Sequence, residues 1–211
     1  MPNWSESSID VTGDASEVKQ LYETKFDFNK IIPMPEPLHI DGNGDDMKCA
    51  NCEEWINQKI KRQPGSPKTW KEGSIYDERV CGVCKISSNI GGRIDGDNEN
   101  EWTSLNEHEK KVAMEWRDKY GTASWYDWSI KNWGTKWPAS EYYDDGLSDD
   151  GTEFHCQFET PWDIPYPIFR KASSKFKKIT ITVYATHEGQ EGTWGYEFKN
   201  GEMVKYPWDS E

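Results

Sequence analysis

Hydrophobic and polar residues alternate along several stretches of the chain. The alternation is strictest over residues 179–186, where an apolar residue occupies every second position, and it recurs over residues 153–160 and 4–11. Side chains of a strand point alternately to the two faces of a sheet. These stretches therefore predict β-strands with one buried and one polar face, and residues 138–143 predict a further strand.

Other stretches place apolar residues three or four positions apart, which predicts amphipathic helices. Asp14 and Glu17 form a capping-box pattern before a helix that we expect to reach about Lys25. A second capping box at residues 104–107 begins a helix that Gly121 is expected to end.

Prolines and glycines predict the remaining boundaries. Pro165 and Pro167 lie at the start of another helix, where a missing N–H costs little. Residues 26–38 are rich in proline and are predicted to be extended. Asn200 and Gly201 form the two-residue turn of a C-terminal hairpin.

Residues 132–137, with the sequence NWGTKW, join a helical region to the strand at 138–143. Trp133 and Trp137 flank Gly134, and two indoles so close together need extensive burial. Gly134 permits a positive φ, so a helix can end there. We predict a structural hinge packed in the core, and a ligand groove lined by the two tryptophans is the alternative.

The order of the predicted elements, without residues 40–102, is strand, helix, strand, strand, helix, strand and a terminal hairpin. This order predicts an α+β fold of the split βαβ, ferredoxin-like type, with an antiparallel sheet and two helices on one face. Residues 1–39 and 103–211 form this predicted domain. Residues 40–102, bordered by acidic glycine-containing segments, form a predicted inserted subdomain.

The inserted segment contains two Cys-x-x-Cys pairs, Cys49 with Cys52 and Cys81 with Cys84. The N-terminus lacks the pattern of a secretory signal, which favours reduced thiols. Four thiolates in two tight turns suit a tetrahedral metal ion, so we predict one structural zinc per chain. An iron–sulfur cluster or a redox dithiol is the alternative. The fifth cysteine, Cys156, is predicted to be a buried core thiol.

The formal net charge of −13 argues against direct nucleic-acid binding and against binding to an anionic membrane. No apolar run approaches the roughly 18 residues that span a bilayer. The 12 tryptophans argue against disorder, because disordered chains are poor in aromatic residues.

Two charged surfaces are candidates for partner binding. The insertion carries a basic patch that includes Lys59, Lys61 and Arg62. Acidic pairs occupy glycine-containing turns, and a divalent-metal site there is disfavoured because solvated acids are ordinary in turns. These acidic residues are Asp144, Asp145, Asp149 and Asp150.

Several segments resemble the YubB-type ferredoxin-like domain family of phages and plasmids. They are residues 1–4 (MPNW), 11–14 (VTGD), 30–35 (KIIPMP), 132–137 (NWGTKW) and 158–162 (FETPW). The fold name does not imply an iron–sulfur ferredoxin. The resemblance implies a mobile-element origin and hence the cytoplasm of a bacterial host.

These features lead to three hypotheses for function. The first is a non-enzymatic phage or mobile-element accessory protein that binds a host macromolecule, such as a defence or regulatory protein. The second is an acidic DNA-mimic inhibitor, in which the acidic turns, with Asp95 and Asp97, imitate phosphates. The third and least favoured is a metal-dependent enzyme that uses the acidic pairs as a carboxylate metal site, because solvated acids are ordinary in such turns.

Overall fold

The structure is a computed structural model, and it describes residues 3–35, 38, 59–61, 78–80, 102, 105, 107–188 and 192–207. The chain divides into two compact units. The first consists of Met1–Pro33 and Ser129–Glu211, and the second of Met34–Trp128. Among the described residues, no helix is long and apolar enough to cross a membrane.

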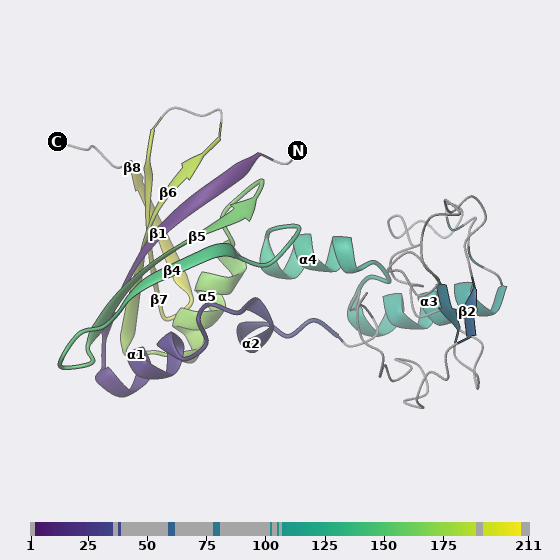
Figure 1. Ribbon diagram of the computed structural model, residues 1–211, viewed down its shortest axis with the longest axis horizontal. Coiled ribbons are helices and arrows are strands. Elements are labelled where there is room, and N and C mark those ends of the chain that lie inside the picture. Colours follow the sequence, from purple (N-terminus) through teal and green to yellow (C-terminus); the bar gives the residue numbers. More distant parts are fainter. Residues whose placement is uncertain are drawn as a thin grey trace. The chain divides into compact units, whose positions relative to one another are not determined.

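The first unit is built on a six-stranded antiparallel sheet with the order β4-β5-β1-β6-β7-β8 (Figure 1). Its strands are β1 (Trp4–Gly13), β4 (Ser140–Leu147), β5 (Glu153–Pro161), β6 (Ile179–His187), β7 (Trp194–Lys199) and β8 (Glu202–Pro207).

The strand order confirms the predicted ferredoxin-like topology. Strand β5 lies between β4 and β1, and β1 lies between β5 and β6. Each of these pairings is antiparallel, so β1 runs parallel to β4 across one strand, and β5 runs parallel to β6 across another. Two interleaved split βαβ units have this arrangement. The β7–β8 hairpin extends the sheet beyond β6, and its turn residues Asn200 and Gly201 both have positive φ, as predicted.

Helices α1 (Ala15–Tyr22) and α5 (Tyr166–Lys175) lie against one face of this sheet (Figure 1). The apolar residues of the strands face them and are buried, as the alternation predicts. The core of this face includes Ile9, Val11, Val18, Leu21, Phe154, Cys156, Phe158, Ile168, Phe169, Ala172, Ile179, Ile181, Val183 and Ala185.

Only the Asp14 half of the predicted capping box forms at the start of α1, because the Asp14 N–H donates to the Lys178 carbonyl and not to Glu17. Asp14 accepts a hydrogen bond from the Glu17 backbone N–H at 3.3 Å, whereas the Glu17 carboxylate accepts one from the Lys178 backbone at 2.8 Å. The helix ends at Tyr22, before the predicted end at Lys25, because Lys25 and Phe26 adopt positive φ.

The prediction of an extended segment over residues 26–38 was wrong at its start. One helical turn, α2 (Phe28–Ile31), forms there, with the Asp27 side chain accepting from the Asn29 N–H at 2.9 Å. The prolines begin at Pro33, so their restriction on the backbone reaches Ile32 but not this turn.

The second unit contains α3 (Glu107–Tyr120), the first part of α4 (Trp125–Trp133) and a short two-stranded sheet of β2 (Lys59–Lys61) and β3 (Glu78–Val80). Gly121, with φ +81°, ends α3, and its N–H donates to the Arg117 carbonyl at 2.8 Å, as predicted. Buried apolar residues of this unit include Leu38, Trp102, Leu105, Val112, Ala113, Trp116 and Trp128.

Candidate functional site

The sheet face opposite α1 and α5 carries the polar half of each alternating strand. We call it the open face, because the described helices of the first unit place their buried side chains on the other face. Its side chains are half-buried or exposed. They are Glu6, Ser8, Asp10 and Thr12; Glu153, His155, Gln157 and Glu159; Thr180, Thr182, Tyr184 and Thr186; Glu197 and Lys199; Glu202 and Val204; and Tyr143 and Asp145.

The open face is strongly acidic. Acidic side chains project from β1, β4, β5, β7 and β8, whereas Lys199 is the one lysine or arginine among the open-face residues just named. Nucleic-acid phosphates would be repelled here. A surface of this kind attracts basic groups.

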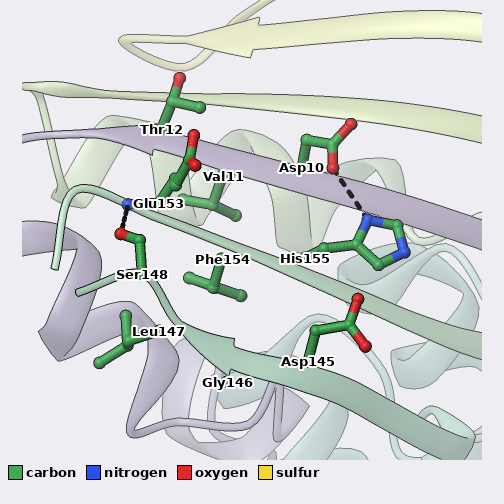
Figure 2. A pocket seen from close by; sticks show the side chains of 10 residues that line it. All are labelled: Asp10, Val11, Thr12, Asp145, Gly146, Leu147, Ser148, Glu153, Phe154 and His155. Atoms are coloured by element: carbon green, nitrogen blue, oxygen red, sulfur yellow. Dashed lines mark hydrogen bonds and ion pairs between the residues drawn. The ribbon is translucent and has the colours of Figure 1, made fainter. Parts of the chain in front are cut away.

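A hollow of about 530 Å³ lies on this side of the sheet, between β1, β5 and the end of β4 (Figure 2). It is lined by Asp10, Val11, Thr12, Asp145, Gly146, Leu147, Ser148, Glu153, Phe154 and His155. A β-bulge forms its β4 side, because three steps from Asp144 to Leu147 match two steps from Cys156 to Phe154. Asp145 follows Asp144 on the opposite face of β4 and lines the hollow.

His155 is held at the hollow by hydrogen bonds to both ring nitrogens. Its Nδ1 lies 2.8 Å from Asp10 Oδ1, and its Nε2 lies 3.2 Å from Gln157 Nε2 (Figure 2 shows the Asp10 pair). A carboxylate accepts but does not donate, so Nδ1 carries the proton and Nε2 accepts from the amide of Gln157. The two hydrogen bonds together fix the orientation of the His155 ring. Within the described residues, no three His, Cys, Asp or Glu side chains converge as metal ligands do.

The acidic turn residues predicted as one surface have different environments. Asp144 faces the helices, where its carboxylate accepts from Tyr22 Oη at 2.9 Å, Lys25 Nζ at 2.7 Å and the Gly146 N–H at 3.0 Å. Asp145 is exposed at the hollow, although it is the next residue.

Asp149 and Asp150 lie in the turn between β4 and β5. Asp150 accepts from Ser148 Oγ at 2.8 Å and from the Thr152 N–H at 3.0 Å, and it stabilises the turn. Hydrogen bonds from Thr152 and Ser148 lower the pKa of Asp150. Asp149 is exposed. Asp145 and Asp149 therefore remain the acids of this group that are available to a partner.

The two neighbouring acids provide a first test. Asp144→Ala is expected to lower the free energy of unfolding by about 2 kcal/mol, because it removes an acceptor shared by three donors. Lys25 is substantially exposed, so its ion pair supplies the smaller part. Asp145→Ala should change stability by less than about 0.5 kcal/mol. Urea denaturation measures both, and equal effects would contradict the assignment.

The contact between Lys25 and Asp144 also predicts how stability depends on pH. The hydrogen bond from Lys25 is the largest cause of the lowered pKa of Asp144. Because the pKa of Asp144 is lower in the folded chain than its ordinary value of about 3.8, the ionised carboxylate stabilises the fold above that value. This stabilisation is lost as the pH falls through the lowered pKa of the folded chain. The stability of Asp144→Asn should therefore fall less steeply than that of the wild type between about pH 5 and pH 2.

The hinge residues occupy both core and surface. Trp133 is 3 % exposed, and its Nε1 donates to the Ile32 carbonyl at 2.9 Å, which confirms core packing for this residue. Gly134 has φ +82°, and a Cβ there would lie 2.9 Å from Pro167 Cδ. Trp137 is 41 % exposed, with Lys136 Nζ 4.5 Å from its ring centroid.

The fold also brings Ser5, His187 and Asp163 together, which no sequence spacing indicated. Ser5 Oγ lies 2.8 Å from His187 Nδ1, and His187 Nε2 lies 4.0 Å from Asp163 Oδ1. Ser5 is 1 % exposed, so a substrate has no access to its hydroxyl, and 4.0 Å is too long for a hydrogen bond. This group is a structural contact and not a nucleophilic site.

Cys156 is a core thiol, as predicted. It is fully buried, and burial raises the pKa of its thiol to about 12, so the reactive thiolate is scarce. It faces away from His155, which also fits the alternation of β5.

The remaining predicted site residues lie in or near the insertion. The backbones of Lys59 and Lys61 belong to β2. Outside the described residues are Arg62, Asp95, Asp97, Cys49, Cys52, Cys81 and Cys84.

Residues 132–211 match a family model described as a ferredoxin-like domain in Api92-like protein. This part of the chain is similar to the ferredoxin-like domain of Api92-like proteins. The match begins at the NWGTKW hinge and covers β4 to β8, and it agrees with the topology of the sheet.

One solved structure, the crystal structure of protein api92 from Yersinia pseudotuberculosis, was also found to be similar. It has 11 % sequence identity, a TM-score of 0.45 and full coverage of both chains. No curated protein matches the chain.

Proposed function

We propose that this chain is a non-enzymatic binding protein that recognises a host macromolecule through the open face of its sheet. The observation that carries the proposal is the acidic, helix-free character of that face within the described first unit. A sheet with one polar face left uncovered offers a broad, rigid surface to a partner. Within the described part of the chain, no cluster of His, Cys, Asp or Glu side chains competes with this face as a metal site.

The setting that we propose is a bacterial cell in which the chain acts as a phage or mobile-element accessory protein. The resemblance of its hinge and first strand to YubB-type domains supports this origin. A host defence or regulatory protein is the partner class that we favour.

A DNA mimic is the second candidate, and the acidic face favours it specifically. Carboxylates on neighbouring strands present closely spaced negative charges, as a nucleic acid presents phosphates. Such a partner would be a basic, nucleic-acid-binding host protein. Its capture should fall steeply between 50 mM and 500 mM salt, because screening weakens exposed charge pairs.

Charge reversal tests the open face. Glu6→Lys, Glu159→Lys and Glu197→Lys together should reduce capture of the partner from bacterial lysate by about tenfold or more, since each lost pair is worth up to about 1 kcal/mol. Quantitative mass spectrometry of the captured proteins measures the change.

The matched control reverses the same number of acids elsewhere, at the exposed residues Glu23, Glu115 and Asp118. It carries the same net charge and should keep the partner. If the open-face variant captures the same proteins in the same amounts as the control, the open face is not the binding surface.

We further propose that Cys49, Cys52, Cys81 and Cys84 hold one structural zinc that stabilises the insertion. Four thiolates leave no open coordination position, so this ion would not be catalytic. Metal analysis of the purified protein should give about one zinc per chain. Cys49→Ser with Cys81→Ser should lose it, and Cys156→Ser should retain it. Zinc retained at full stoichiometry in the double variant would rule out the site.

A further inference from the structure

We propose that the hollow on the open face receives an arginine side chain from a basic segment of the protein partner. The inference rests on the proposed function, because it assumes that the open face is the binding surface, and it identifies the chemistry of the contact. The occupant is a protein segment, since the acidic face repels nucleic acid.

The charges at the hollow are the first part of the argument. Asp10, Asp145 and Glu153 line it from three different strands, and no lysine or arginine is among its lining residues. Asp10 Oδ1 is used by His155, and within the described residues Oδ2 accepts no hydrogen bond. The Glu153 carboxylate forms no ion pair with the described part of the chain. The hollow therefore concentrates negative charge without a lysine or arginine among its lining residues.

The side chains around Asp145 show why the cation should come from outside. The neighbouring Asp145 carboxylate raises the pKa of the Tyr143 hydroxyl. A neutral hydroxyl orients the carboxylate but does not neutralise it. Its neighbour Asp144 has Lys25 for this purpose, whereas Asp145 has no such partner in the described chain.

The size of the hollow and the placement of its carboxylates on adjacent strands favour a guanidinium over an ammonium ion. A volume of about 530 Å³ exceeds one side chain and can also admit the flanking peptide. A guanidinium is planar, presents five donors in a rigid fork and can contact carboxylates on adjacent strands at once. Lysine offers a more strongly hydrated point charge. The fixed ring of His155 adds a flat surface beside the carboxylates (Figure 2).

The test uses a glycine-spaced peptide with three arginines and its lysine counterpart, each titrated into the full-length ¹⁵N-labelled protein at low salt. We expect the arginine peptide to shift the amide signals of Gly146, Ser148 and His155 in a saturable manner. The lysine peptide should bind at least about threefold more weakly. Equal binding of the two peptides, or shifts spread evenly over acidic residues elsewhere, would overturn the inference.

Matched variants locate the contact. Asp145→Asn with Glu153→Gln should weaken arginine-peptide binding at least about fivefold, because two charge pairs are lost. Asp118→Asn with Glu23→Gln removes the same charge outside the hollow and should change binding by less than about twofold. Equal loss in both double variants would overturn the inference.

The two proposals fail in distinguishable ways. If the peptides do not prefer the hollow but the Glu6, Glu159 and Glu197 reversals still abolish partner capture, the arginine contact is wrong and the binding face stands. If those reversals leave capture unchanged, the proposed function itself fails, whatever the peptides do.

Discussion

Replacing Trp133 by alanine is expected to lower the free energy of unfolding of the first unit by about 3–5 kcal/mol, the usual cost of removing a buried tryptophan. Trp133 is 3 % exposed and meets Phe28 edge to face, with ring centroids 5.8 Å apart. Its Nε1 also donates to the Ile32 carbonyl, which would lose this partner. The substitution thus removes ring packing and a hydrogen bond together.

Two further variants separate these contributions. Trp133→Phe keeps an aromatic ring but loses the Nε1 donor, so it should cost clearly less than alanine. Trp137→Ala removes the exposed tryptophan of the same hinge and should cost less than about 1 kcal/mol. Chemical denaturation followed by circular dichroism measures all three. If Trp133→Ala and Trp137→Ala lowered the free energy of unfolding by similar amounts, the assignment of Trp133 to the core and Trp137 to the surface would be contradicted.

Gly13→Ala should destabilise the first unit by about 3 kcal/mol. Gly13 joins β1 to α1 with φ +147°, which side chains rarely tolerate. A Cβ there would lie 2.2 Å from the Lys178 carbonyl oxygen, so the backbone before β6 would have to move. The shift would also disturb the hydrogen bond from the Asp14 N–H to the same oxygen.

Gly146→Ala is the matched control for Gly13→Ala. Gly146 also has a positive φ, +86°, but a Cβ there meets no atom within 4 Å. Only the conformational cost remains, about 1 kcal/mol. Thermal unfolding of the two variants should therefore differ clearly, and a Gly13 variant as stable as the Gly146 variant would contradict the close approach of Lys178.

The alternating strands could be predicted because burial on one face dictates their residue types. Phe154, Cys156 and Phe158 are buried as expected, and His155 lies on the other face. The NWGTKW hinge was predictable in part, since Gly134 needs positive φ and Trp133 needs burial, whereas the expected burial of Trp137 was wrong.

The candidate site was harder to predict, because it depends on register and not on local pattern. Asp10 and His155 are directly opposite in the β1–β5 ladder, yet they are far apart in sequence. Asp144 and Asp145 are successive strand residues on opposite faces, and the bulge between Asp144 and Leu147 has no clear signal except Gly146 after two acids. Sequence alone therefore grouped acids that the fold uses in different ways.

The central position of β1 has a consequence for how the chain folds during synthesis. Val11 pairs with Phe154 on one side and with Ile181 on the other, so β1 has neither neighbour until β5 and β6 have been made. At ordinary ribosome speeds, the delay is on the order of 10 s. During that time β1 lacks the two strands that will pair with its edges, and its apolar residues have no sheet to pack within. Completion of this sheet is therefore a late, long-range step, and nascent chains that end before Ile179 should be readily cut by protease within β1.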